Sequence, residues 1–304
     1  MIIKFVRIGR LHLVFTASLL LIIGILFALS TGVQIQPEKI VLGASISITS
    51  LLSVIYANDY FDLEGDSHNQ HTSFSGGSGV LIKNPQLRKL AKWFAVSQTI
   101  TSITLGAIFT MLYGYPIAFF LFIVIANILG WFYAAPPIKL SYRGFSEITQ
   151  MTVAGFMNPL FGYIITEPAI DFPFLVYVIA FTLYAFAFQI SVEIPDLEAD
   201  QIVNKKTLIT TSGRKKSFTI LAAVVSIVTL YLLNISVINP ITPKTDLQLI
   251  PIFSFLPLTS GLRSFLKRSE DRKTAISLAS HNIATLTAFF LLANLYLIIK
   301  IVLR

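Results

Sequence analysis

Four carboxylates stand close together in Asn58-Asp59-Tyr60-Phe61-Asp62-Leu63-Glu64-Gly65-Asp66, directly after an uncharged apolar run from Ile40 to Ala57. With its flanks, this run is long enough to cross a bilayer as a helix, so the acids appear where a membrane helix ends. On a continuing helix Asn58, Asp62 and Asp66 recur every four residues and share one face. Acids so close repel one another unless a cation lies between them. Mg2+ takes such oxygen ligands and is commonly shared with substrate phosphates, so the stretch predicts a magnesium site.

A second acidic stretch, Glu193-Ile194-Pro195-Asp196-Leu197-Glu198-Ala199-Asp200, also follows an uncharged apolar run, from Phe172 to Val192. Asp196 and Asp200 are four residues apart and share a helix face. Two acidic helix ends that face one cavity could hold two or more Mg2+ ions with a diphosphate between them. Solvated helix ends are the simpler interpretation of both stretches. However, ionisable groups at membrane depth usually serve function, which favours the metal site.

The composition is that of a membrane protein. Of the 304 residues, 55% are hydrophobic and only 12% are charged, and the mean hydropathy is +0.76. This is too apolar for a soluble domain of such length, so we expect a single all-α membrane domain over residues 1–304. The first apolar run, Leu11 to Leu29, lacks a small-residue cleavage pattern and is expected to stay as a membrane helix. Cysteine is absent, which excludes disulfides and zinc–thiolate sites.

Apolar runs of about 17 to 25 residues predict nine membrane helices. They are expected near residues 11–30, 39–60, 91–112, 115–134, 147–166, 172–192, 218–238, 248–265 and 275–302. The eighth contains Pro251 and Pro257, which membrane helices tolerate where neighbours satisfy the freed backbone groups.

The positive charges indicate an orientation. Most of the 23 lysine and arginine residues fall on one face if the nine helices alternate across the bilayer. By the positive-inside rule that face is cytoplasmic, which places the N-terminus and both acidic stretches on the cytoplasmic side of the cell membrane. The formal net charge of +8 could suggest nucleic acid. Its distribution over the loops favours topology and attraction to the lipid bilayer instead, so no nucleic-acid partner is expected.

A basic loop follows the fourth predicted helix. Pro136 and Pro137 should end that helix and force an extended turn. The turn would aim Lys139 and Arg143 across the same face as the aspartates, where cations can neutralise diphosphate oxygens. Topology alone would also place positive charge in this loop.

As a set, these motifs resemble the UbiA-type intramembrane prenyltransferase superfamily. The matching segments are Asn-Asp-x-x-Asp-x-x-x-Asp at 58–66, Tyr-x-x-Pro-Pro-x-Lys at 133–139, Asp-x-Glu-x-Asp at 196–200 with Asn204-Lys205-Lys206-Thr207-Leu208, and Arg10 ahead of the first helix. Each motif is modest alone, but together they cover nearly the whole chain in order. Glu193 and Asn204 stand where many members have aspartate and glycine, which leaves the class intact.

The resemblance implies nine transmembrane helices around a central cavity, with a cap on the cytoplasmic side. It also implies Mg2+-dependent transfer of a polyprenyl group from its diphosphate, such as geranylgeranyl diphosphate, to a hydrophobic acceptor. The Mg2+ ligands that it implies are Asn58, Asp62, Asp66, Asp196 and Asp200. Their four aspartates and Lys139 would be the catalytic residues. The diphosphate would be bound by Arg10, Asn58, Tyr133, Lys139 and Arg143, with Lys205 and Lys206 as further candidates.

The acceptor is less well defined. The loop Thr72-Ser73-Phe74-Ser75-Gly76-Gly77-Ser78 and the segment Glu193 to Leu208 resemble the menaquinone-pathway branch, whose aromatic acceptor is 1,4-dihydroxy-2-naphthoate. An alternative acceptor is geranylgeranylglyceryl phosphate, as in archaeal ether-lipid synthesis, which should need an additional cationic site for its own phosphate. A membrane transporter is a further alternative, because intramembrane acids also mark ion pathways. Against it, the acids cluster at one face and inverted repeats are not obvious.

Overall fold

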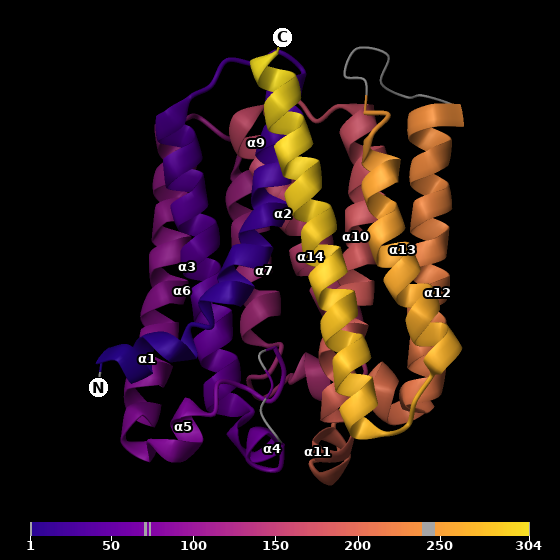
Figure 1. Ribbon diagram of the computed structural model, residues 1–304. Coiled ribbons are helices and arrows are strands. Elements are labelled where there is room, and N and C mark those ends of the chain that lie inside the picture. The colour runs from indigo at the N-terminus through magenta and orange to yellow at the C-terminus, as the bar shows by residue number, and fades with distance from the viewer. Residues whose placement is uncertain (1, 70–71, 73, 239–246, 304) are drawn as a thin grey trace. The chain divides into compact units, whose positions relative to one another are not determined.

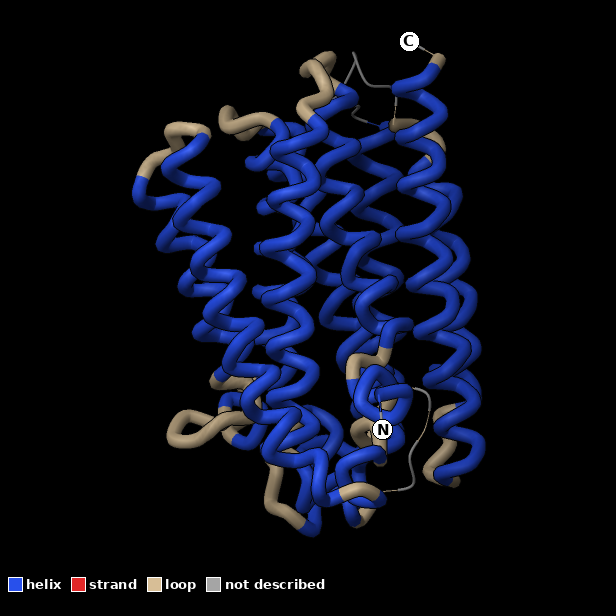
Figure 2. Tube along the Cα trace, turned by 90° about the vertical axis from the view of Figure 1, so that its left-hand side faces the viewer, coloured by secondary structure: helices blue, strands red, loops and turns tan. Residues whose placement is uncertain are grey.

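The structure is a computed structural model that describes residues 2–69, 72, 74–238 and 247–303. These residues form helices, turns and loops, and no extended strand occurs among them (Figure 2). Ser73, which belongs to the loop used for the acceptor prediction, lies outside the described residues. The chain divides into two compact units, which are treated separately below. Unit 1 comprises Met1–Ser18, Pro37–Thr149 and Glu198–Thr207, and unit 2 comprises Leu19–Gln36, Gln150–Leu197 and Leu208–Arg304.

The core of unit 1 is the pair of long helices α3 (Pro37–Phe61) and α6 (Arg88–Leu112), with α7 (Ile117–Trp131) packed on both (Figure 1). Polar side chains join these helices in the interior. The Ser102 hydroxyl of α6 donates to the Ile46 carbonyl of α3 at 3.1 Å. Such interhelical hydrogen bonds are common in membrane proteins, where apolar burial between helices gives little net attraction. Short helices border the unit: α1 (Ile2–Ile8), α4 (Leu63–Ser67), α5 (Val80–Lys83) and η1 (Pro85–Leu87).

Unit 2 contains a row of neighbouring helices, in which α13 (Ile250–Lys267) packs between α12 (Leu208–Leu233) and α14 (Arg272–Val302) (Figure 1). The helix α10 (Phe172–Glu193) packs on both α12 and α14. Two glycines allow the second half of α2 (Leu11–Ser30) to approach α9 (Asn158–Thr166) closely. A side chain at Gly24 would overlap the Pro159 backbone, and one at Gly162 would overlap the Leu21 backbone. The remaining helical segments of this unit are η3 (Met151–Met157), η4 (Ile194–Asp196) and η5 (Asn234–Ile238), while α8 (Ser146–Gln150) and α11 (Leu197–Ile202) cross from one unit to the other.

Within the described chain, six helices are long and apolar enough to cross a membrane: Leu11–Ser30, Pro37–Phe61, Pro85–Leu112, Phe172–Ile202, Leu208–Ile238 and Arg272–Val302. Helical structure also occupies the other three predicted places, but each of these segments is short or interrupted. The helix α7 has only 15 residues. The predicted span 147–166 is divided by the π-helical η3, and α13 contains Pro257. The all-α class is therefore confirmed, whereas the number of nine spans, the central cavity and the cap stay predictions.

Candidate active site

The first acidic motif extends the helical backbone of α3 beyond its end. The N–H of Asp62 donates to the Asn58 carbonyl at 2.8 Å, and the N–H of Asp66 donates to the Asp62 carbonyl at 2.9 Å. These are the i to i+4 bonds of an α-helix, although Asp62 itself departs from helical geometry, with φ −91° and ψ 9°. The predicted spacing of Asn58, Asp62 and Asp66 along one helical face is thus present.

The loop after the motif folds back onto it at two acids. Ser78 donates its backbone N–H and its hydroxyl to the Asp59 carboxylate, which is only 4% exposed. At Gly77 the backbone is left-handed, with φ +63°, and an added Cβ would overlap the Asp66 carboxylate. Glycine adopts this conformation without steric cost. The loop therefore fixes Asp59 structurally and lies directly against Asp66.

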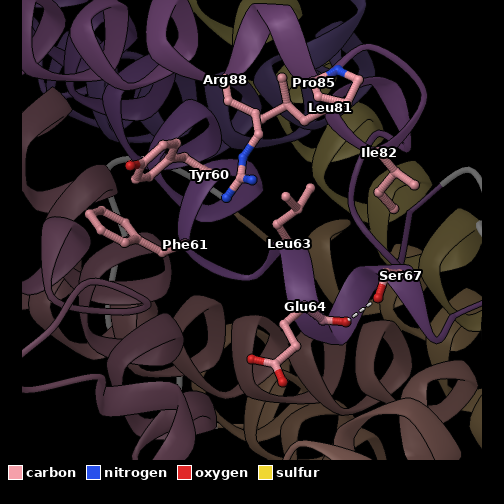
Figure 3. Close-up of a pocket in the computed structure, with 9 residues that line it drawn as sticks. All are labelled: Tyr60, Phe61, Leu63, Glu64, Ser67, Leu81, Ile82, Pro85 and Arg88. Carbon is pink, nitrogen blue, oxygen red and sulfur yellow. Dashed lines mark hydrogen bonds between the residues drawn. The ribbon is translucent and has the colours of Figure 1, made fainter.

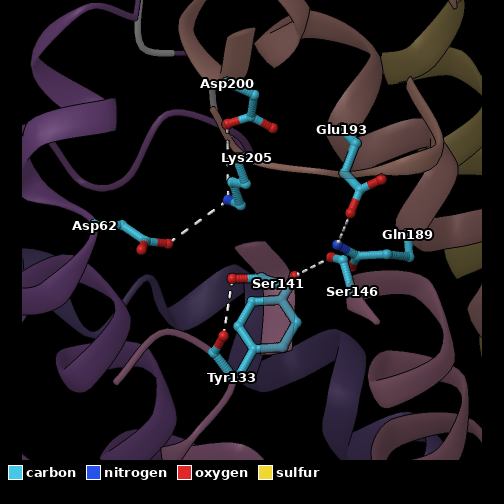
Figure 4. Close-up of polar contacts among 8 residues, drawn as sticks. All are labelled: Asp62, Tyr133, Ser141, Ser146, Gln189, Glu193, Asp200 and Lys205. Carbon is cyan, nitrogen blue, oxygen red and sulfur yellow. Dashed lines mark hydrogen bonds and ion pairs between the residues drawn. The ribbon is translucent and has the colours of Figure 1, made fainter. Parts of the chain in front are cut away.

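Lys205 joins the two acidic motifs within unit 1 (Figure 4). Its Nζ lies 3.7 Å from Asp62 Oδ2 and 3.7 Å from Asp200 Oδ1. The side chains of Lys205 and Asp62 are each 15% exposed, and that of Asp200 is 9% exposed. The predicted convergence of the two motifs is therefore present for this pair of aspartates. One ammonium between two carboxylates leaves a formal charge of −1, which attracts a further cation.

The charged neighbours of Lys205 and Tyr142 fix the protonation states of these two side chains. Burial alone would lower the pKa of Lys205, but Asp62 and Asp200 outweigh it and hold the pKa well above its usual value. Burial raises the pKa of the neighbouring Tyr142 phenol, and the Asp62 carboxylate raises it further. Lys205 is thus an ammonium and Tyr142 a neutral phenol that hydrogen-bonds with Asp62. Tyr142 was not among the predicted site residues, although it lies between Lys139 and Arg143 in the basic loop.

Three further predicted cations of unit 1 lie around Tyr142: Lys139 and Arg143 of the basic loop, and Lys206. Lys139 Nζ lies over the Tyr142 ring at 4.6 Å from its centroid, and Lys205 Nζ lies 5.6 Å from the same centroid. Arg143 and Lys206 form an isolated backbone bridge, in which the Lys206 N–H donates to the Tyr142 carbonyl at 3.3 Å. Both of these side chains are exposed. The four basic residues thus border one short piece of backbone around Tyr142.

Tyr133 is oriented by its neighbours in unit 1, as Figure 4 shows. Its hydroxyl lies 2.6 Å from the Ser146 hydroxyl. Its carbonyl accepts from both the hydroxyl and the N–H of Ser141, at 2.8 and 2.9 Å. Ser141 and Ser146 are fully buried, so they belong to the support of this loop. Neither serine was among the predicted site residues.

Arg10 stands in a left-handed backbone conformation, with φ 42°, between α1 and α2. Its Nη2 is buried and has no hydrogen-bond partner in the described part of the chain. A buried guanidinium nitrogen without an acceptor is costly, and an anionic ligand would satisfy it. This observation supports the predicted role of Arg10 toward the diphosphate.

The first part of the second acidic motif, up to Leu197, belongs to unit 2 and begins where α10 ends. Glu193, one of the departures from the family pattern, is 4% exposed and accepts from Gln189 Nε2 at 2.8 Å (Figure 4). Asp196 follows on the short turn η4, and the backbone of that turn accepts hydrogen bonds from Arg214 and Arg272. In the sequence these arginines contribute only to the positive charge that indicates orientation. A possible signal was Gly213, which breaks the helix directly before Arg214.

The residues of unit 1 fit a hard cation such as Mg2+. Asn58 Oδ1 and Asp62 Oδ1 are buried and lack a hydrogen-bond partner among the described residues. Both are oxygen atoms of the kind that Mg2+ prefers. No three His, Cys, Asp or Glu residues of the described chain lie close enough to enclose a metal by themselves. Mg2+ does not need such a cage, because it keeps several waters and is usually shared with substrate phosphates.

A half-open cavity of about 490 Å3 lies beside the first motif (Figure 3). Its lining includes Tyr60, Phe61, Leu63 and Glu64 of that motif, but not Asn58, Asp62 or Asp66. Apolar side chains make up much of its lining, and Arg88 and Glu64 bring charge to it. The Arg88 guanidinium carbon lies 6.0 Å from the centroid of the Tyr60 ring, and Lys92 Nζ lies 5.6 Å from it. The lining residues are Tyr60, Phe61, Leu63, Glu64, Ser67, Leu81, Ile82, Pro85 and Arg88.

Carboxylates and lysines thus lie together at the end of an apolar helix. A family model described as the UbiA prenyltransferase family matches residues 17–286, and the chain belongs to that family. It is therefore a prenyltransferase, and with its six long apolar helices it is a multi-pass membrane protein. No match is found among curated protein sequences.

Solved structures share the fold. A UbiA homologue from Archaeoglobus fulgidus, described as bound to GPP and Mg2+, has a TM-score of 0.64 at 16% identity, covering 95% of this chain and 99% of that one. A structure described as concerning digeranylgeranylglyceryl phosphate synthase has a TM-score of 0.64 at 18% identity, covering 97% and 99%. An apo UbiA homologue from Aeropyrum pernix K1 has a TM-score of 0.66 at 13% identity, covering 93% and 98%.

Proposed function

We propose that the protein transfers a polyprenyl group from a polyprenyl diphosphate, such as geranylgeranyl diphosphate, to a hydrophobic acceptor within the membrane, with Mg2+ as cofactor. The observation that carries this proposal is Lys205 Nζ at 3.7 Å from both Asp62 and Asp200. Acids from both motifs are thereby joined in one polar site. The family membership and the related structure with GPP and Mg2+ support the same reaction.

The acids would hold the metal and the bases would hold the leaving group. The proposed Mg2+ ligands are Asn58, Asp62, Asp66, Asp196 and Asp200. When bound, Mg2+ neutralises diphosphate oxygens and so favours breakage of the allylic C–O bond. Arg10 and Lys139 would contact oxygens that the metal leaves uncovered, and charge stabilisation of this kind is usually the largest catalytic contribution. Tyr133, Arg143, Lys205 and Lys206 complete the proposed diphosphate set.

The proposed reaction develops negative charge on the leaving diphosphate and positive charge on the prenyl carbon. The C–O bond breaks, its electron pair leaves with the diphosphate, and the prenyl carbon becomes cationic. The acceptor then forms the new bond to that carbon and releases the proton that its attacking oxygen or ring carbon carried, to the diphosphate or to water. A site at the end of apolar helices restricts water, which would otherwise capture the cation. The apolar product would remain in the bilayer.

For the acceptor we propose 1,4-dihydroxy-2-naphthoate, with the site on the cytoplasmic face of the cell membrane. The support is the sequence of the loop at 72–78 and of the segment at 193–208. Gly77 of that loop lies directly against Asp66, so this loop borders the first motif. The cytoplasmic orientation rests on the distribution of lysine and arginine.

One observation favours a second acceptor, geranylgeranylglyceryl phosphate. This molecule needs a cationic site for its own phosphate, and the cavity beside the first motif contains Arg88. Lys92 lies over the same Tyr60 ring and adds a second positive charge. The fold itself does not separate the two acceptors, because a structure concerning digeranylgeranylglyceryl phosphate synthase shares it.

Diphosphate release by detergent-purified protein tests the proposal. The protein is given geranylgeranyl diphosphate and Mg2+ with either acceptor in turn, beside Asp62→Asn and Asp196→Asn. Turnover with one acceptor, lost without Mg2+ and in both variants, is expected and identifies that acceptor. Arg88→Met should reduce turnover only with the glyceryl phosphate acceptor. Metal-dependent binding without turnover would reject both acceptors, and the absence of binding as well would reject geranylgeranyl diphosphate as the donor.

A further inference from the structure

Two arginines hold the backbone that carries Asp196, and they come from distant parts of unit 2. Arg214 Nε donates to the Ile194 carbonyl at 3.2 Å. Arg272 donates to the Pro195 carbonyl through both Nε, at 3.3 Å, and Nη2, at 3.2 Å. The two consecutive carbonyls immediately before Asp196 are therefore each bound by a guanidinium.

The local sequence explains why these carbonyls need outside donors. Pro195 has no N–H and interrupts the helix that α10 began, so the chain continues as the three-residue turn η4. A turn of this kind has poor internal hydrogen bonding. Ile194 and Pro195 are both buried, and buried carbonyls are almost always paired. A guanidinium also complements the partial negative charge at the C-terminal end of a helix such as α10.

The position of Arg214 is equally specific. Gly213 adopts φ 77° and ψ 165° inside α12, a backbone conformation that favours glycine. The next residue, Arg214, is only 3% exposed. Its Nη1 also donates to the carbonyl of Glu270, in the link before α14, at 3.2 Å. Arg214 thus ties the Asp196 turn to the segment from which Arg272 arises.

The positive-inside rule, which concerns charge in loops, does not explain why Arg214 is buried. Lys215 and Lys216 follow directly, are exposed, and already provide positive charge at this place. Burial of a guanidinium is costly unless it is paired and hydrogen-bonded, as Arg214 is here. Its planar fork reaches two carbonyls at once, which the single ammonium of a lysine does not reproduce in the same geometry.

We propose that Arg214 and Arg272 are positioning residues that fix Asp196 for metal binding and thereby set the Mg2+ affinity of the enzyme. The inference rests on the proposed function, in which Asp196 is a ligand. Metal sites require their ligands to be held within about 0.5 Å of the productive geometry. Groups that orient the ligands of a metal typically change its affinity by about 10- to 100-fold when removed.

The test is geranylgeranyl diphosphate binding by purified protein, measured by calorimetry over a range of Mg2+ concentrations. Arg214→Gln and Arg272→Gln should each raise the Mg2+ concentration for half-maximal binding by about 10-fold or more, and saturating Mg2+ should restore binding. Arg214→Lys should remain impaired because it lacks the fork. Lys215→Gln, the exposed neighbour, is the matched control and should behave as wild type.

Unchanged Mg2+ dependence in folded Arg214→Gln and Arg272→Gln would overturn the inference while leaving the proposed function intact. Binding lost at every Mg2+ concentration, together with a lowered Tm, would also overturn it, because the arginines would then only stabilise the fold. If Arg214→Gln does not fold, the Mg2+ dependence of Arg272→Gln tests the inference instead. Arg272 is only half-buried at the start of α14, so its substitution should disturb the fold less. Wild-type binding without any Mg2+ dependence would overturn both proposals.

Discussion

The acidic motif at 58–66 and the acidic motif at 193–200 carry the same kind of side chains but are held differently. The first keeps helical backbone bonds through Asp62 and is bordered by a glycine loop. The second breaks at Pro195, and arginines bind its carbonyls from outside. A carboxylate on a continuing helix is placed by its own backbone, whereas one on a short turn depends on distant residues. Changes at the two motifs should therefore have different signatures.

The largest effect is expected from the acids themselves. Asp62→Asn and Asp196→Asn should each lower kcat by about 10^2- to 10^3-fold, because each removes a proposed ligand of the Mg2+ that would neutralise the leaving diphosphate. The Tm of Asp62→Asn should fall modestly, because the largely buried Lys205 loses the charge of one of its two carboxylate partners. Steady-state kinetics with a thermal melt checks both points. Retained activity in Asp62→Asn would remove the first motif from the site.

The next effect is expected at the lysine that joins the motifs in unit 1. Lys205→Met leaves Asp62 and Asp200 without their shared ammonium, which should cost about 1 to 3 kcal/mol of stability in the absence of divalent ions. Mg2+ should then raise the Tm of Lys205→Met more than that of wild type, because the ion replaces the missing charge. Lys206→Met, at the exposed neighbour, is the control. Equal Mg2+-induced shifts in all three proteins would contradict this role of Lys205.

A smaller effect should distinguish backbone strain at a glycine from contact with the Asp66 carboxylate. Gly77→Ala and Gly114→Ala both force alanine into a left-handed conformation, at φ +63° and +67°, which costs about 1 to 2 kcal/mol. An added Cβ at residue 77 overlaps the Asp66 carboxylate, whereas nothing lies within 4 Å of one at residue 114. Both variants should lose stability, but only Gly77→Ala should also raise the Mg2+ requirement for activity. Equal Mg2+ requirements would show that Asp66 does not act through the metal.

The smallest effect is expected at Asp271, which caps α14 just before Arg272. Its Oδ2 accepts from the Thr274 N–H at 2.8 Å. The backbone N–H of Thr274 lowers the pKa of Asp271 below the usual 3.8. Because the folded-state pKa is depressed, the stabilisation is present above that usual pKa and is lost as the pH falls through the folded-state value. Asp271→Ala should therefore lower the Tm slightly at pH 7. A deficit that persists at acidic pH would exclude the carboxylate as its cause.

Much of the fold was predictable because it follows from local chemistry. Helices occur wherever the apolar runs predicted them, and the spacing of Asn58, Asp62 and Asp66 on one helical face is confirmed by backbone bonds. The predicted span at 218–238 instead begins earlier, at Leu208. The sequence of that segment is polar up to Lys216, so hydropathy placed the start of the span too late. The π-helical η3 was not predicted either, since apolar periodicity does not distinguish it from an ordinary helix.

The residue types of the site were predictable, but which side chains contact one another was not. Lys205 belongs to a motif, yet its place between Asp62 and Asp200 depends on how distant segments pack. Tyr142 and Ser146 act through hydrogen bonds that no local pattern encodes. Arg214 carries the same positive charge as Lys215 and Lys216 beside it, so the sequence does not reveal that Arg214 alone is buried. Long-range packing, which a single sequence does not display, separates these cases.

The most direct measurement is calorimetric binding of geranylgeranyl diphosphate to wild type, Asp62→Asn and Asp196→Asn, with and without Mg2+. If both acidic helix ends hold the metal and the diphosphate together, wild type binds only with Mg2+ and each variant loses that binding. Wild-type affinity in Asp196→Asn, with Mg2+ dependence intact, would contradict this shared site, because Asp196 would then not hold the metal.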